Sequence, residues 1–226
     1  MESLPERLAA VRERIARAAE RARRDPAEVT LLAVTKIFPA SAIQEAYRLG
    51  LREFGENYVQ EFEGKAPEVG RLAGARFHLI GHLQSNKSKK AAELFQVIQT
   101  VDSVKLAGRL NEAGAALGVT LDVMLEVKLS HEDAKSGADP DQLPEIIAAV
   151  HQCPNLRLFG LMTMPPWTGD AEAARPIFRR LRELAEQHGL GGLSMGMSHD
   201  LEAAIEEGST CVRVGTALFG KRAKHQ

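Results

Sequence analysis

The sequence predicts a (β/α)8 TIM barrel, a single-domain α/β fold, with an extra N-terminal helix. Eight short apolar segments typical of parallel strands alternate with helical stretches along the 226 residues. We see no linker that divides the chain, so we expect one domain over residues 1–226. An open doubly wound sheet is the competing fold, but no G-x-G-x-x-G motif follows the first strand.

The chain begins with an amphipathic helix. Leu4, Leu8 and Val11 recur at spacings of four and three, which places them on one helical face. Pro26 ends the helix, because the residue before a proline avoids helical dihedral angles. We therefore expect residues 1–25 to form a helix that packs on the barrel.

Strands and helices then alternate to the end of the chain. We expect strands at residues 30–36, 52–54, 77–80, 97–101, 121–127, 158–162, 193–195 and 212–214. We expect helices at residues 41–49, 58–65, 87–94, 104–117, 143–151, 171–187 and 201–206. The longest connections, residues 131–141 and 164–169, are short enough to be functional βα loops.

Composition excludes several classes of partner. The net charge is −1, which gives no electrostatic basis for binding nucleic acid or an anionic membrane. No apolar run is long enough to span a bilayer, and the first residues lack the pattern of a signal peptide. Cys153 and Cys211 lie far apart in the sequence, as expected for two reduced thiols. We therefore expect a cytoplasmic protein.

Lys36 is the first candidate for chemistry. It closes the apolar run that starts at Thr30, and the carboxyl ends of parallel strands form the functional face of a barrel. An amine held against an apolar wall is disfavoured in its charged form, which makes it a nucleophile toward aldehydes and ketones. The alternative is a lysine that only extends its ammonium group to solvent from the strand end.

The last two predicted strands end in candidate anion sites. Ser198 precedes the helix that begins near Leu201, and Gly215 and Thr216 open another helical turn. Backbone N–H groups and hydroxyls at such positions bind anions, and these loops of a barrel commonly bind phosphate. The alternative is ordinary helix capping, with Ser198 as the N-cap residue.

Three other polar positions stand out. Arg213 lies between two valines in an apolar strand, so it projects to the opposite face, either into an internal ion pair or toward a ligand. Asn57 follows the second strand and either caps the next helix or contacts a ligand. His78 and His82 do not match a zinc motif and no third ligand is evident, so we expect no metal site.

Seven segments carry a family resemblance. They are Leu32-Ala33-Val34-Thr35-Lys36, Phe54-Gly55-Glu56-Asn57-Tyr58-Val59-Gln60-Glu61, His78 through Lys87, Lys135-Ser136-Gly137, Gly160-Leu161-Met162, Gly196-Met197-Ser198-His199-Asp200 and Arg213 through Gly220. Together they resemble the pyridoxal phosphate homeostasis protein family, whose members are similar to the N-terminal barrel of alanine racemase. The segments span nearly the whole chain in the expected order.

This resemblance implies a monomeric barrel that carries pyridoxal 5′-phosphate (PLP) on Lys36 as a Schiff base. It implies that Arg213 faces the pyridine nitrogen, that Ser198, Gly215 and Thr216 hold the phosphate, and that Asn57 and Met197 lie near the ring. The set matches what PLP requires: an amine for its aldehyde, N–H donors for its phosphate and a partner for its ring nitrogen.

Two positions depart from the pattern of the family. Thr35 stands where many relatives have serine, which keeps the hydroxyl, and Phe38 stands where some carry a second lysine. Any role of that second lysine is therefore absent here. The roles of Lys87, Lys89 and Lys135 stay open.

The expected function is a non-catalytic PLP carrier or regulator in vitamin B6 homeostasis, with transient contacts to PLP-dependent apoenzymes. Racemases of this barrel type use a second base, a tyrosine, with help from a separate β domain, for which this chain has no room. An arginine at the ring nitrogen also keeps the ring a weaker electron sink. The alternatives are a PLP-dependent amino-acid racemase or related enzyme, and a cofactor-free Schiff-base aldolase on a similar barrel.

Overall fold

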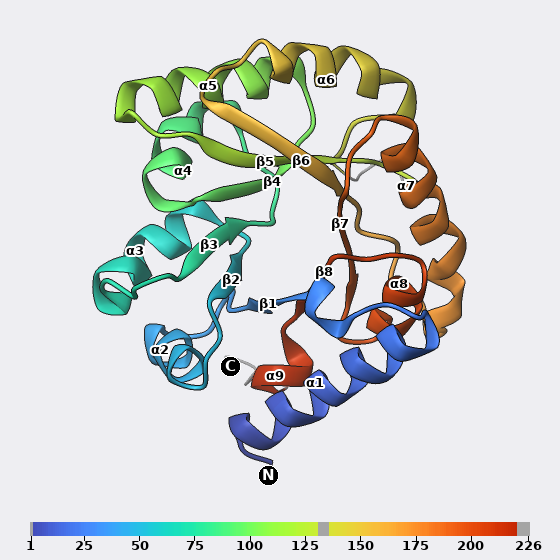
Figure 1. The fold of residues 1–226 in the computed structure, drawn as a ribbon. Helices are drawn as coiled ribbons and strands as arrows, with labels where there is room; N and C mark the ends of the chain where they lie inside the picture. Colours follow the sequence, from blue (N-terminus) through green and yellow to red (C-terminus); the bar gives the residue numbers. More distant parts are fainter. Residues whose placement is uncertain (1, 131–135, 221–226) are drawn as a thin grey trace.

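Eight parallel strands close into one barrel in chain order, from β1 to β8 (Figure 1). The structure is a computed structural model and describes residues 2–130 and 136–220. The strands are β1 Thr30–Val34, β2 Glu53–Glu56, β3 Arg76–Leu79, β4 Val97–Val101, β5 Leu121–Glu126, β6 Leu156–Met162, β7 Gly192–Met197 and β8 Cys211–Val214. Pairing of β1 with β8 closes the barrel, with Leu32 opposite Arg213. The predicted fold class is confirmed.

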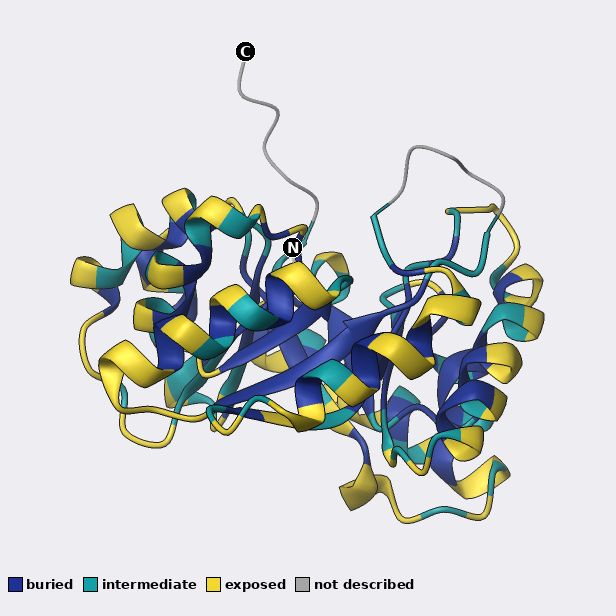
Figure 2. Cartoon of the chain, turned by 90° about the horizontal axis from the view of Figure 1, so that it is seen from above, coloured by how far each residue is buried: buried dark blue, intermediate teal, exposed yellow. Residues whose placement is uncertain are grey.

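A helix follows every strand, and one further helix precedes β1. The helices are α1 Leu4–Arg21, α2 Ala40–Arg48, α3 Val59–Val69, α4 Ser88–Leu94, α5 Val104–Leu117, α6 Leu143–His151, α7 Arg175–Gln187, α8 Leu201–Glu206 and α9 Thr216–Phe219. They surround the barrel with buried faces inward and exposed faces outward (Figure 2). The main apolar core therefore lies between the strands and the helices.

The N-terminal helix packs where the barrel closes. Its apolar stripe, including Leu4, Leu8, Val11 and Ile15, is buried. The helix contacts α8 and α9, which follow the last two strands (Figure 1). It ends at Arg21, four residues earlier than the sequence predicted.

Some element boundaries differ from the prediction for local reasons. Strand β1 ends at Val34, so Lys36 lies in the following turn, where Ile37 adopts a positive φ of 62°. Helix α7 begins at Arg175 and not at Ala171, because Pro176 cannot donate the hydrogen bond that a continuous helix requires. A 3-10 turn over Ala171–Ala174 precedes it. The helices and strands themselves lie where the sequence predicted them.

The contact between β6 and β7 depends on two glycines. A Cβ atom at Gly160 would lie 2.1 Å from the backbone oxygen of Gly192. We expect Gly160→Ala to lower the free energy of unfolding by about 3 kcal/mol, because the strands would have to separate. Urea unfolding measures this change.

Gly108→Ala in α5 is the matched control. A Cβ atom there meets no atom within 4 Å. This substitution should raise the free energy of unfolding by about 0.5–1 kcal/mol through helix propensity. Equal urea midpoints for Gly160→Ala and the unsubstituted protein would contradict the close approach of the strands.

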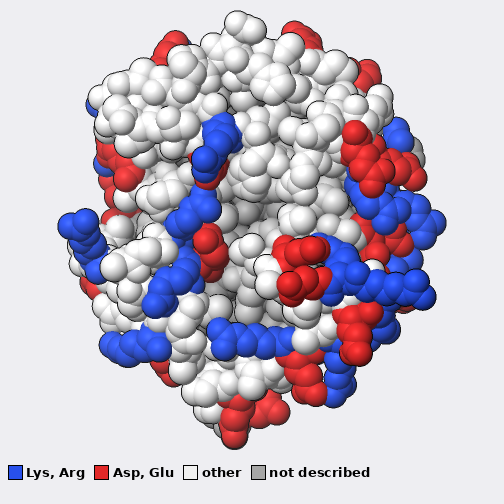
Figure 3. Space-filling model, viewed as in Figure 1, with Lys and Arg blue, Asp and Glu red and all other residues white. Residues whose placement is uncertain are grey.

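The structure also bears on membranes and surface charge. Across residues 2–130 and 136–220, no helix has the length and hydropathy needed to cross a bilayer. On the face that Figure 3 presents, basic and acidic side chains alternate around a hollow whose walls are mostly uncharged. This face therefore carries no extended field of one sign.

Candidate functional site

A cavity of about 370 Å³ lies at the carboxyl ends of the strands. Its walls come from the ends of β1, β2, β3, β6, β7 and β8 and the segments that follow them. All seven residues that the sequence analysis assigned to a cofactor site line it: Lys36, Asn57, Met197, Ser198, Arg213, Gly215 and Thr216. Val34 and Ile80 add apolar surface. The barrel thus brings an amine, a guanidinium group and two hydroxyls to one cavity.

The backbone on both sides of Lys36 is held by α3. The hydroxyl of Thr35 donates to Glu56 Oε1 at 2.7 Å, and Lys65 Nζ donates to the Thr35 carbonyl oxygen at 3.0 Å. The Ile37 N–H donates to the carboxylate of Glu61. A β-branched residue at positive φ is strained, so this contact offsets a local cost and fixes the turn that presents Lys36.

The sequence analysis assigned no role to the supporting residues Glu56, Glu61 and Lys65. Glu56 is fully buried on β2, and Lys65 lies 2.9 Å from its Oε1 atom. Burial raises the pKa of the Glu56 carboxyl, and the Lys65 ammonium opposes that shift. The sequence did contain a signal for Glu56, because it is a charged residue directly after Phe54 and Gly55 in a buried strand. A charged residue in an apolar strand is also what identified Arg213.

Arg213 is 3% exposed and reaches the cavity from inside the barrel. Nη1 donates to Ser194 Oγ and Nη2 to the Thr163 carbonyl oxygen, both at 2.8 Å. No ion pair joins Arg213 to an acidic residue in the part of the chain that the structure describes. The sequence left two interpretations of Arg213 open, an internal ion pair and a contact with a ligand. The structure gives no support to the internal ion pair. Two of the five N–H groups of a guanidinium are used by these bonds, which leaves donors for a ligand.

The loops after β7 and β8 meet at Ser198. Its hydroxyl accepts a hydrogen bond from the Ala217 N–H at 3.3 Å. The helix-capping alternative is wrong for Ser198, because the N-cap of α8 is Asp200. The Asp200 Oδ1 atom accepts a hydrogen bond from the Met197 N–H at 2.6 Å. Helices α8 and α9 are short, so the donors that these loops offer are hydroxyls and backbone N–H groups and not extended helix dipoles.

Helix α1 fastens this region from outside. Arg14 donates to the Ser198 carbonyl oxygen at 3.0 Å and pairs with Glu202 at 2.6 Å. The sequence analysis did not single out Arg14. Helix α1 therefore packs on the barrel and also holds the loop that contains Ser198.

Asn57 lies in the cavity wall and does not cap α3. The N-cap position is Tyr58, and no side chain caps that helix end. The loop after β6 contributes Met164, Trp167 and Asp170 to the opposite wall. The sequence analysis recognised that loop by its length but assigned no role to its residues.

Neither tyrosine of the chain lines the cavity. The Tyr47 hydroxyl donates to the Ala73 carbonyl oxygen at 2.9 Å, and Arg52 packs over its ring. Tyr58 is exposed. His199 does line the cavity, with its ring near that of Trp167.

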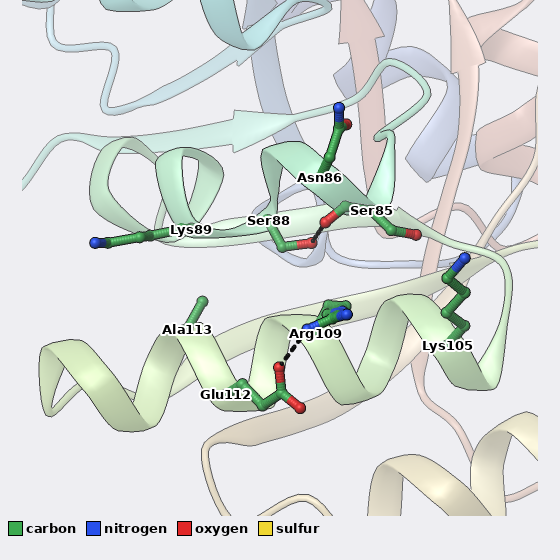
Figure 4. Close-up of a pocket in the computed structure, with 8 residues that line it drawn as sticks. All are labelled: Ser85, Asn86, Ser88, Lys89, Lys105, Arg109, Glu112 and Ala113. Atoms are coloured by element: carbon green, nitrogen blue, oxygen red, sulfur yellow. Dashed lines mark hydrogen bonds and ion pairs between the residues drawn. The ribbon is translucent and has the colours of Figure 1, made fainter.

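The remaining polar candidates lie elsewhere. Among the described residues, no group of three or more His, Cys, Asp and Glu side chains could hold a metal ion. A separate pocket of about 450 Å³ between α4 and α5 includes Lys89, Lys105 and Arg109 (Figure 4). Arg109 pairs with Glu112, and the buried Ser88 hydroxyl donates to the Ser85 carbonyl oxygen. Lys135 lies outside the described residues.

Comparison with known proteins adds independent findings. The family model for the alanine racemase N-terminal domain matches residues 7–223. A pyridoxal phosphate homeostasis protein of Pseudomonas aeruginosa is 51% identical over 224 residues, covering 98% of this chain and 97% of its own. The protein of that name in Escherichia coli K12 is 44% identical, covering 98% of both chains.

Solved structures agree with this match. PipY of Synechococcus elongatus with PLP bound is 40% identical, with a TM-score of 0.83, and covers 96% of this chain and 100% of its own. An alanine racemase of Clostridium difficile 630 has a TM-score of 0.73 at 14% identity and covers 98% of this chain and 57% of its own. The racemase likeness concerns the fold alone.

Proposed function

Because this chain belongs to the pyridoxal phosphate homeostasis protein family, we propose that it binds PLP and acts in vitamin B6 homeostasis, with Lys36 as the site of attachment. The relatives that carry this name match over their full length, and the PipY structure holds PLP. The chain therefore has the whole fold of these relatives.

One observation carries the assignment of the site. The seven residues chosen from sequence surround one cavity, although they come from four separate segments of the chain. A cavity of about 370 Å³ falls within the range typical of cofactor pockets. Its donors also fit PLP chemically: an amine for the aldehyde, hydroxyls and N–H groups for the phosphate, and a guanidinium for the ring nitrogen.

Each group has a defined task in this proposal. When bound, PLP supplies an aldehyde that condenses with an amine and a ring that withdraws electrons. Lys36 provides the amine, and the Thr35, Glu56 and Glu61 contacts hold its backbone in place. Ser198 and Thr216 donate hydrogen bonds to the phosphate. Arg213 donates to the ring nitrogen and, since arginine does not give up its proton, leaves that nitrogen neutral.

We propose that the protein holds and delivers the cofactor and does not turn over amino acids. A neutral ring nitrogen weakens electron withdrawal, and neither Tyr47 nor Tyr58 reaches the cavity. His199 is the nearby group that a racemase reading would invoke as a base. An assay of racemisation therefore decides between the two functions.

We expect no sustained racemisation of L-alanine by the PLP-loaded protein. Loss of one positioned base costs about 10²–10⁴-fold in rate. Chiral chromatography of alanine after long incubation measures turnover, with Lys36→Ala as the control for contaminating racemase. Turnover that disappears in Lys36→Ala would contradict the carrier function and favour the racemase.

The absorbance spectrum tests the cofactor itself. Protein incubated with PLP and freed of excess ligand should absorb visible light, and borohydride should remove that band while fixing the label. A colourless protein that reacts through Lys36 only with carbonyl substrates would favour the aldolase alternative.

We further propose that the protein is a cytoplasmic monomer that passes PLP to apoenzymes. Two cysteines without a disulfide among the described residues, with Cys211 buried, support a reducing compartment. The monomeric state is what the resemblance to the family implies. Light scattering should give a mass near 24.6 kDa. PLP-loaded protein mixed directly with a PLP-free apoenzyme should restore the activity of that enzyme. Activity should not return when a dialysis membrane separates the two proteins.

A further inference from the structure

The inside of the barrel contains a continuous chain of polar side chains. Arg213 Nη1 donates to Ser194 Oγ at 2.8 Å, and Ser194 Oγ donates to Gln99 Oε1 at 2.6 Å. Gln99 Nε2 lies 2.9 Å from His78 Nδ1, and His78 Nε2 contacts the carboxylate of Glu53. Barrel interiors are usually filled by branched apolar residues, so this set needs an explanation.

The chain runs from the cavity to the opposite end of the barrel. Arg213 lines the cavity, whereas Glu53 is the first residue of β2 and its side chain is 24% exposed. The members come from β8, β7, β4, β3 and β2, so the path crosses the barrel interior. A small apolar cluster of Leu32, Val34, Ile80 and Cys211 is buried apart from the main core, and Gln99 Nε2 lies 4.0 Å from Cys211 Sγ.

With the Gln99 amide oriented as the structure has it, the hydrogen bonds take one direction. Arginine can only donate, so the Ser194 hydroxyl accepts from it and is left to donate to the Gln99 carbonyl oxygen. The Gln99 amide nitrogen then donates to His78 Nδ1, which requires the proton of a neutral imidazole to be on Nε2. That proton points at Glu53. All four bonds therefore run the same way, from a cation to a carboxylate.

Burial supports a neutral His78. It lowers the pKa of the imidazole, and the neighbouring Glu53 carboxylate only partly opposes that shift. Arg76 also favours the neutral form, whereas Asp122 opposes it. The buried Arg213 thus has no carboxylate in contact within the described ranges, but a hydrogen-bonded path leads to one. Aligned hydrogen bonds polarise one another, so each link strengthens its neighbours.

We propose that Ser194, Gln99, His78 and Glu53 are positioning residues that hold Arg213 at the cofactor. The chain keeps the guanidinium in one orientation, with its remaining N–H groups facing the cavity. It also lets the charge of Glu53, at the far mouth of the barrel, influence the donor at the ring nitrogen. This inference rests on the proposed function, because the ring nitrogen is that of PLP.

Two substitutions break the chain at different places. Gln99→Leu removes both central bonds and should weaken PLP binding about tenfold and shift the visible absorption band of the bound cofactor. Glu53→Gln removes only the distant charge, so it should produce a smaller shift in the same direction. Glu28→Gln is the control for loss of a carboxylate charge, since Glu28 is an exposed residue that pairs with Arg24 outside the barrel.

A measurement without cofactor tests the chain directly. Nitrogen NMR of His78 in the PLP-free protein should show the neutral Nε2–H tautomer, and Gln99→Leu should change the Nδ1 signal while Glu28→Gln should not. An Nδ1–H tautomer would overturn the direction of the chain and with it the proposal. If Gln99→Leu fails to fold, PLP affinity, the absorption band and the His78 signals are compared in Ser194→Ala and Glu53→Gln instead.

The outcomes separate this inference from the proposed function. If the unsubstituted protein binds no PLP, the proposed function fails, whatever the NMR result. If it binds PLP and Gln99→Leu and Glu53→Gln keep its affinity and spectrum, the function stands and the positioning role is wrong. A merely structural chain would lower thermal stability without moving the absorption band, which also overturns the proposal.

Discussion

Protein carrying Lys36→Ala is expected to give no phosphopyridoxyl peptide after incubation with PLP and reduction by borohydride. The unsubstituted protein should give one main labelled peptide, the one that contains Lys36. The loss should be complete, because the covalent bond requires this amine and no hydrogen bond can replace it. Digestion and mass spectrometry of the reduced protein measure the label.

The fold should survive this substitution. Lys36 lies half-buried in the turn after β1 and outside the packed interior of the barrel. The melting temperature of Lys36→Ala should therefore stay close to that of the unsubstituted protein. A collapse in melting temperature would mean that the missing label reports unfolding and not chemistry.

Lys128→Ala is the matched control for attachment. Lys128 lines an adjoining cavity of about 520 Å³, which shares Met164, Trp167 and Met197 with the Lys36 cavity. A stray reaction with PLP would therefore find this amine close by. The variant should keep the full label, and a main label on the peptide of Lys128 would show that Lys36 is the wrong residue.

The second large effect is expected from Ser198→Ala combined with Thr216→Ala. A charge-assisted hydrogen bond is worth roughly 1.5–3 kcal/mol, so two lost hydroxyls should lower PLP affinity by about 10²-fold or more. Pyridoxal lacks the phosphate, so its affinity should change little. Titrations with the two aldehydes, followed by absorbance, measure the difference.

The comparison of ligands also corrects for structural damage. The Ser198 hydroxyl accepts from the Ala217 N–H, so its loss could disturb the loop for any ligand. Thr168→Ala is a further control, because Thr168 lines the same cavity but its hydroxyl donates to the Asp170 carbonyl oxygen at 2.6 Å. Equal losses for PLP and pyridoxal would place the phosphate elsewhere.

Much of the fold follows from local patterns in the sequence. Parallel strands buried on both faces appear as short apolar runs, such as Val97–Val101, in which every residue is buried. The amphipathic helices between them complete the βα units. Boundaries were less certain because they depend on single residues: Pro176 delays α7, and β1 ends at Val34, before the turn that contains Lys36 and Ile37.

The sequence by itself also determined which residues gather at the candidate site. In a parallel barrel every strand points the same way, so residues that follow different strands meet at one end. Lys36, Ser198 and Thr216 needed only this rule, whereas the resemblance to the family placed Asn57 and Met197 near the ring. Arg213 was identified because a charge between two valines in a buried strand requires a partner.

Only the tertiary structure decided what holds these residues in place. The contacts of Thr35 with Glu56, of Arg14 with Ser198 and of His78 with Gln99 join positions that no periodicity links. They depend on the register between neighbouring strands and on the angle at which each helix packs. A side-chain hydrogen bond forms within about 3 Å, and distances of that size are set by the closed barrel and not by spacing along the chain.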